Sequence, residues 1–218
     1  MTKITELPEI SVLADDDFVT AVDVSDMSES PTGKNVKIQK QNLLGGSGAV
    51  SKFEIARITD PGTGEFDFTA IPSDYENLYI EGWIRSSAVG QSDGTRVYLN
   101  GNTTDANYWL QAIEGADGTP NVGEVAAPSS GSITATDGPA GWISQFSAKF
   151  INYRGATYRH TFLTNTISPI IAGNMITGWR GIQVTADIGA ITQIQVQSDG
   201  HPTDTLVGTL ILYGEKTI

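Results

Sequence analysis

The chain has 218 residues, 39% of them hydrophobic, which is enough for one substantial core and a small appendage. Its formal net charge of -12 argues against a nucleic-acid partner, because binding to phosphates requires clustered lysine and arginine. The absence of cysteine excludes a disulfide framework, a thiolate zinc site and a cysteine nucleophile.

The sequence contains no run of about 18 apolar residues, so we expect no membrane insertion. The first residues include Lys3, Glu6 and Glu9 and lack the apolar core of a signal peptide, so we expect no export by the usual route. With 24 glycines, 9 prolines and 17% charged residues, the chain is rich in turn formers. This composition favours an all-β fold.

Residues 1–45 are predicted to form a small separate module. Residues 4–10 are a short apolar-polar segment, residues 13–26 hold an acidic turn and a strand, and residues 30–44 lead from a Pro/Gly turn into a second alternating run. This order predicts a two-stranded hairpin with a long tip. A segment this short, without disulfides, rarely stabilises itself, so we expect its apolar residues to dock on a partner. The predicted attachment residues are Ile4, Leu7, Ile10, Leu13, Phe18, Val22, Val24, Val36, Ile38, Leu43 and Leu44.

After a predicted Gly/Ser hinge at residues 46–51, residues 52–218 carry repeated period-two patterns with turn signals between them. These patterns predict an antiparallel β-sandwich of jelly-roll type. Residues 205–213 are apolar on both faces, which suits a central strand or one covered by a neighbouring subunit. Residues 115–141 are rich in Gly, Pro, Ser, Ala and Thr and are predicted to form an extended surface excursion that carries binding. The predicted strands are residues 65–71, 76–85, 144–151, 157–163, 190–197 and 205–213.

Two parts of the chain resemble known virion proteins. The order ITELPE, LADDD, VDVSD, SPTG, K-x-V-x-I and NLL in residues 4–44 resembles the N-terminal virion-attachment segment of tailed-bacteriophage fibres, spikes and related surface proteins. Residues 68–87, 97–108 and 205–216 are similar to a β-sandwich domain at the distal end of small phage virion proteins. The resemblance implies a homotrimer that binds the capsid surface or the host.

We therefore expect a non-enzymatic structural component of a tailed-phage virion, without cofactors, assembled in the host cytoplasm and carried on the virion surface. The chain has no heptads or fixed-period repeat that would form a long shaft, which favours a trimeric capsid decoration or cement protein, anchored through residues 1–45 to capsid or tail proteins. One alternative is a short tail fibre or receptor-binding protein that recognises host surface glycan. Another is a glycan-cleaving spike enzyme.

The titratable residues have structural explanations. His160 alternates with Tyr158 and Phe162, which predicts a hydrogen-bonded core histidine in place of a catalytic base. His201 lies between SDG and proline, the chemistry of an exposed turn. Glu81 is the best candidate for a catalytic carboxylate in the enzymatic alternative. The acidic residues that follow the aromatic pair Tyr108-Trp109 are further candidates, namely Glu114 and Asp117.

Metal binding has weak sequence support, and no metal site is predicted. The run Asp15-Asp16-Asp17 is favoured as a turn and cap, because adjacent residues of a strand point to alternate sides. Loop residues with hard oxygen atoms would bind Ca²⁺ only if their loops converged, and they lack the spacing of an EF-hand. These residues are Asp93, Asn100, Asn102 and Asp105.

Aromatic residues near predicted loops are the remaining candidates for binding. Tyrosine and tryptophan at such edges stack on sugar faces or fill a subunit interface, although core packing is the alternative for each one. The candidates are Tyr108, Trp109, Trp142, Tyr153 and Trp179.

Overall fold

The computed structural model describes residues 18–23, 34–39, 50–116, 119–125, 128–138, 141–155, 159–171 and 174–217. The chain divides into two compact units between Ser51 and Lys52, and Thr217 and Ile218 are grouped with the first. The predicted boundaries had placed a hinge at residues 46–51, whereas strand β3 already begins at Val50.

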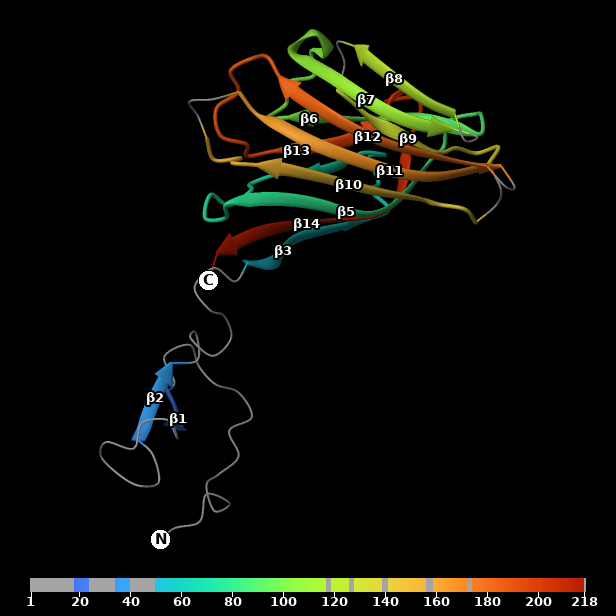
Figure 1. Ribbon diagram of the computed structural model, residues 1–218. Coiled ribbons are helices and arrows are strands. Elements are labelled where there is room, and N and C mark those ends of the chain that lie inside the picture. The colour runs from blue at the N-terminus through green and yellow to red at the C-terminus, as the bar shows by residue number, and fades with distance from the viewer. Residues whose placement is uncertain are drawn as a thin grey trace. The chain divides into compact units, whose positions relative to one another are not determined.

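In the first unit, β1 (Phe18–Asp23) pairs with β2 (Lys34–Gln39) in antiparallel register (Figure 1). Val19 lies opposite Ile38, and Ala21 lies opposite Val36. Both strands come from the runs that predicted the hairpin. The other predicted attachment residues lie outside the described residues; they are Ile4, Leu7, Ile10, Leu13, Val24, Leu43 and Leu44.

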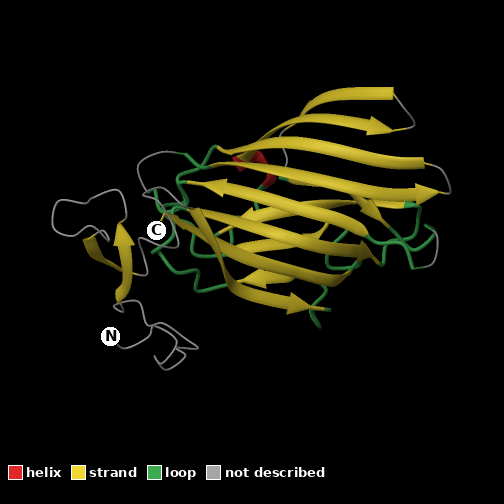
Figure 2. Ribbon diagram, turned by 60° about the horizontal axis from the view of Figure 1, so that its bottom comes forward, coloured by secondary structure: helices red, strands yellow, loops and turns green. Residues whose placement is uncertain are grey.

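The second unit is an antiparallel β-sandwich, as predicted. Its large sheet has eight strands in the order β3-β14-β5-β10-β11-β12-β7-β8, and its small sheet has four in the order β4-β13-β6-β9. Figure 2 shows the large sheet as one broad layer. The bounds of its strands are β3 (Val50–Thr59), β14 (Leu206–Thr217), β5 (Asn77–Ser86), β10 (Ser144–Ile151), β11 (Thr161–Ile171), β12 (Asn174–Val184), β7 (Tyr108–Ala116) and β8 (Thr119–Val125). The small sheet contains β4 (Phe66–Phe68), β13 (Ile194–Ser198), β6 (Ser92–Leu99) and β9 (Ser129–Thr134), and a short 3-10 turn, η2 (Asp105–Asn107), precedes β7.

The apolar core fills the space between the two sheets. Alternate residues of β5 and β10 point inward, so Ile80, Ile84 and Phe146 are fully buried. Phe150 and Phe162 lie opposite each other in the register of β10 and β11, and their rings stack with centroids 5.0 Å apart. Each such large side chain contributes roughly 1.5–3 kcal/mol by its burial. This burial selects the register, because a shift by one residue would turn every core side chain outward.

The strand at residues 205–213 is β14, which lies between β3 and β5. Leu210, Ile211 and Leu212 are all buried there. Its apolar character on both faces therefore belongs to a central strand, one of the two explanations expected from the sequence.

The predicted surface excursion at residues 115–141 is wrong in part, because it contains two strands, β8 and β9, that form sheet edges. Hydroxyl groups make β9 compatible with the interior. The Thr95 hydroxyl donates to the carbonyl of Gly131 at 3.0 Å, and the Ser130 hydroxyl donates to Thr95 at 2.8 Å. These side chains are buried although the segment looks polar.

The edge strand β3 is strongly charged. Arg57 donates to Glu54 at 2.8 Å within the strand, and Lys52 reaches Glu81 of β5 at 2.7 Å. All four side chains are partly exposed. Charged side chains of this kind commonly protect sheet edges from pairing with other strands.

Candidate functional site

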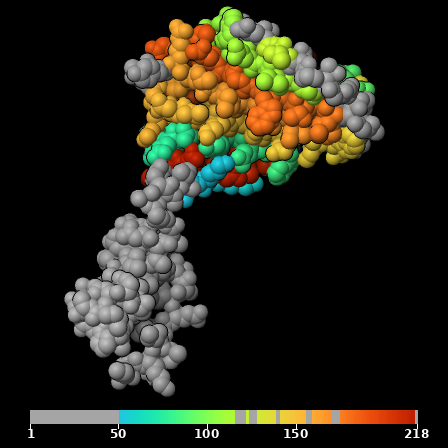
Figure 3. Space-filling model, viewed as in Figure 1, coloured from blue at the N-terminus to red at the C-terminus, as the bar shows by residue number. Residues whose placement is uncertain are grey.

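The outer face of the large sheet carries large apolar side chains over β11, β12 and β7, whose colours in Figure 3 run from orange to green. Inward positions of these strands alternate with outward ones, and none of the outward residues is charged. We call this surface the uncharged face. It consists of Trp109, Gln111, Ile113, Gly115, Thr161, Leu163, Asn165, Ile167, Thr177, Trp179, Gly181 and Gln183.

A row of exposed side chains crosses the uncharged face and continues onto β8. In the strand register, Trp179 lies opposite Ile113, and Ile113 lies opposite Val122. Directly opposed residues of antiparallel strands have Cβ atoms roughly 4.5–5.5 Å apart, so these three form one apolar ridge. Their exposed fractions are 63% for Trp179, 59% for Ile113 and 76% for Val122. Nothing within the described residues covers this ridge.

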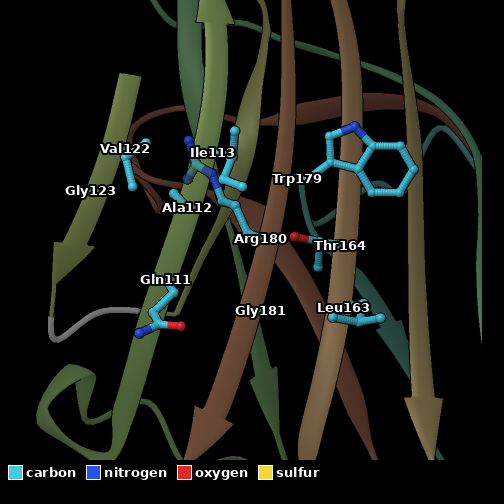
Figure 4. A pocket seen from close by; sticks show the side chains of 10 residues that line it. All are labelled: Gln111, Ala112, Ile113, Val122, Gly123, Leu163, Thr164, Trp179, Arg180 and Gly181. Atoms are coloured by element: carbon cyan, nitrogen blue, oxygen red, sulfur yellow. The ribbon is translucent and has the colours of Figure 1, made fainter. Parts of the chain in front are cut away.

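A hollow of about 650 Å³ lies beside this ridge. Gly181 follows Trp179 by two residues and therefore points to the same face of β12. A side chain added at Gly181 would find Leu163 Cδ2 at 3.8 Å as its nearest neighbour, so the missing side chain leaves open space. In Figure 4, Trp179 and Ile113 lie at one end of the hollow, and Gln111 and Leu163 lie at the other. The full lining is Gln111, Ala112, Ile113, Val122, Gly123, Leu163, Thr164, Trp179, Arg180 and Gly181.

The other half of the same sheet is charged. The Lys52 ammonium lies 4.2 Å from the ring centroid of Tyr79, and that of Lys149 lies 5.0 Å from it. Glu215 accepts hydrogen bonds from Asn77 at 2.6 Å and from the Tyr79 hydroxyl at 2.9 Å. Burial opposes ionisation of Glu215, but these hydrogen bonds hold its pKa below the usual value. The charged groups of this half therefore satisfy one another.

The candidate catalytic carboxylates do not meet. Glu81 lies on the outer face and forms an exposed ion pair with Lys52. Glu114 points toward the interior, where it pairs with the buried guanidinium of Arg180 and accepts a hydrogen bond from Ser132 at 3.2 Å. Since the two carboxylates lie on opposite faces of the sheet, they cannot act together on one glycosidic bond. Asp117 lies outside the described residues.

The surroundings of both histidines indicate structural roles. His160 is 6% exposed, and its Nε2 lies 2.6 Å from the carbonyl oxygen of Gly189, in agreement with the predicted core histidine. His201 lies in a turn but is only partly exposed, with Nε2 3.5 Å from a carboxylate oxygen of Glu65. Tyr158, its expected neighbour on the face of His160, lies outside the described residues.

The four residues considered as Ca²⁺ ligands take part in separate hydrogen bonds, and Asp93 lies in strand β6 and not in a loop. The hydroxyls of Ser86 and Ser198 both donate to Asp93 Oδ2 at 2.6 Å. No group of three or more histidine, aspartate or glutamate side chains in the described parts of the chain is arranged to hold a metal ion. Among the other residues, Asp105 accepts hydrogen bonds from Arg96 and Tyr98, Asn102 accepts one from Asn107, and Asn100 accepts from the backbone amides of Thr192 and Gln193. Asp15, Asp16 and Asp17 lie outside the described residues.

The five candidate aromatic residues separate into three groups. Tyr108 and Tyr153 are 0% and 1% exposed, so neither lines the surface, contrary to the binding role considered for them. Their hydroxyls explain the burial, because each one bonds backbone groups in the interior. Trp142 is partly buried, and its carbonyl accepts a hydrogen bond from Arg85 at 2.8 Å.

Trp109 and Trp179 remain on the outer face of the sheet, 45% and 63% exposed. Sequence reasoning missed their apolar neighbours Ile113 and Leu163, and also Trp83, which is 46% exposed on β5. These residues could have been identified from the sequence as large apolar residues at outward positions of strands whose inward positions are already apolar.

Comparison with known proteins adds little. No protein-family model matches the chain, and no curated protein matches it. Among solved structures, a fructofuranosidase variant from Schwanniomyces occidentalis, complexed with fructosylnystose, aligns with a TM-score of 0.22 and 6% sequence identity. The alignment covers 92% of this chain and 39% of that protein, and so weak a likeness carries no argument. In the part of the chain that the structure describes, no helix has the length and apolarity to cross a membrane.

Proposed function

We propose that this protein is a non-enzymatic structural component of a tailed-phage virion surface, a homotrimeric capsid decoration or cement protein. Residues 1–45 attach it to the particle, and the sandwich is presented outward. The resemblance of residues 4–44 to virion-attachment segments supports the location. The observation that carries a structural role is the uncharged face, which exposes the large apolar residues Trp109, Ile113, Leu163 and Trp179 on a protein of net charge -12.

The chemistry of this face favours assembly over catalysis. Large apolar patches on soluble proteins commonly mark protein–protein interfaces. Two candidate catalytic carboxylates are engaged elsewhere, Glu81 with Lys52 and Glu114 with Arg180. Attachment through several copies of a small docking segment multiplies its strength, because each bound copy raises the effective concentration of the next. A trimer on a capsid surface would therefore attach more strongly than a single copy.

Immunogold electron microscopy of intact virions, with antibody against residues 52–218, tests the location. Label spread evenly over the head supports decoration. Label confined to the tail tip favours the short-fibre or receptor-binding alternative, and particles without label contradict any virion role.

A deletion of residues 1–45 tests the attachment. The shortened protein is expected to be absent from purified particles while still folding in solution. Particles that retain the shortened protein at the normal copy number would contradict attachment through this segment.

A further inference from the structure

We infer that the uncharged face is the contact between copies of this chain, and that the Trp179 ring of one copy enters the hollow over Gly181 of a neighbouring copy. The inference deepens the homo-oligomer of the proposed function by naming the surface that forms it. It concerns association in solution, so it can fail while the virion role stands.

Charge identifies the occupant of the face. Copies of a protein with 25 acidic and 13 basic residues repel one another in general. They approach most closely where charge is absent, and the cores of protein interfaces are depleted of charged residues. A partner of a different kind, attracted by the negative charge of the protein, would bind where the charged residues lie and not on the uncharged face. The uncharged face is therefore the surface on which a second copy docks with the least repulsion.

Shape points to the same occupant. Trp179 projects from β12 with 63% of its surface exposed, and it borders one end of the hollow that continues over Gly181 of the same strand. The hollow's volume of about 650 Å³ admits an indole ring, since ligand pockets measure roughly 300–1,000 Å³. A projection and a hollow on one face allow every copy to donate one ring and to receive one, and such contacts form a closed assembly when the rotation between neighbouring copies closes.

The lining of the hollow favours a protein side chain over a sugar. Its walls include the exposed apolar side chains of Ile113, Val122, Leu163 and Trp179, and the buried residues Thr164 and Arg180 lie at its floor. Gln111 contributes a side-chain amide. A pyranose presents several hydroxyl groups, and those left without hydrogen bonds on apolar walls would weaken its binding. An indole ring needs only one hydrogen-bond acceptor, and tryptophan is enriched among residues that anchor interfaces.

Sedimentation equilibrium of the full-length protein tests the inference. The unmodified chain is expected to form an oligomer at micromolar concentration. Trp179→Ala removes the ring, and Gly181→Leu fills the hollow of the receiving copy. Each is expected to raise the dissociation constant by about 30-fold or more, the size of an interface hot spot. Gly181 has no left-handed backbone and no crowded neighbour, so leucine is compatible with folding.

Two variants outside the face serve as controls. Val89→Ala trims a side chain that is 90% exposed, and Gly62→Leu adds one where no atom lies within 4 Å. Both are expected to leave the oligomer unchanged, and circular dichroism confirms that every variant is folded. A monomeric unmodified protein would overturn the inference, as would an oligomer that neither Trp179→Ala nor Gly181→Leu weakens. Glycan binding by the unmodified protein that Trp179→Ala abolishes, without a change in oligomeric state, would assign the hollow to a sugar and also overturn it.

Discussion

Replacing Tyr108 by phenylalanine removes a single oxygen atom from the interior. The Tyr108 hydroxyl donates to the carbonyl of Asn102 at 2.8 Å and accepts from the backbone amide of Leu99 at 3.0 Å. Tyr108 and Leu99 are both fully buried. Tyr108→Phe therefore leaves a buried amide without its bonding partner, and the ring itself keeps its packing. The hydrogen bonds lost in Tyr108→Phe connect the end of β6 and the loop after it to the start of β7.

The expected cost follows from the desolvation of the orphaned group, which is about 1–3 kcal/mol. For a domain of this size, about 1 kcal/mol lowers the Tm by roughly 2–4 °C, so the melting temperature of Tyr108→Phe should fall by roughly 2–12 °C at pH 7. Differential scanning calorimetry measures the shift. Tyr213→Phe, at a partly exposed tyrosine of β14, is the matched control and should change the Tm by less than a degree or so.

The same residue predicts a dependence on pH. Burial raises the pKa of Tyr108 to about 12, against an ordinary value of 10.0. Between these two values the unfolded chain loses the Tyr108 proton while the folded chain keeps it, so stability present below pH 10 falls as the pH rises toward 12. Tyr108→Phe should flatten this part of the stability profile. An unchanged Tm at pH 7 together with an unchanged alkaline profile would refute the reasoning.

Three further substitutions test other parts of the sandwich. Gly82→Ala places a Cβ within clashing distance of the carbonyl oxygen of Thr209 on β14, so it should lower the free energy of unfolding by about 1–3 kcal/mol in urea titrations. Arg85 donates to the carbonyl groups of Ala135, Gly138 and Trp142, and Arg85→Ala should speed hydrogen exchange around these residues more than in β5. Glu81→Gln breaks only an exposed ion pair and should cost less than about 1 kcal/mol. A larger loss there would show that the pair has a structural role.

Strands with strict alternation could be predicted from the sequence. Residues 76–85 and 144–151 gave β5 and β10 nearly to the residue, because their inward positions carry large apolar side chains. Strand β9 could not be predicted in this way, since Ser130 and Gly131 lack apolar bulk. Their place in the interior depends on hydrogen bonds with Thr95, a residue far away in the sequence.

The uncharged face could be identified only from the strand register, and composition alone did not reveal it. Trp179 and Ile113 belong to strands separated by β8, β9, β10 and β11 in chain order, and only the pairing of β12 with β7 brings them together. Tyr108 and Trp109 are adjacent in the sequence, yet one is buried and the other exposed, because successive residues of a strand point to opposite faces. Their position near a predicted loop therefore could not show which of the two side chains is exposed.

The two edges of the large sheet carry features that oppose pairing with further strands. Strand β3 carries the charged residues Lys52, Glu54 and Arg57, and β8 contains Pro120, which has no amide hydrogen to donate to an added strand. Growth by strand addition would continue without limit, as it does in fibrils. Because both edges are unfavourable for such pairing, open-ended growth of this kind is opposed on each side of the sheet. The folded protein can therefore reach a high local concentration with less tendency to form fibrils through its sheet edges.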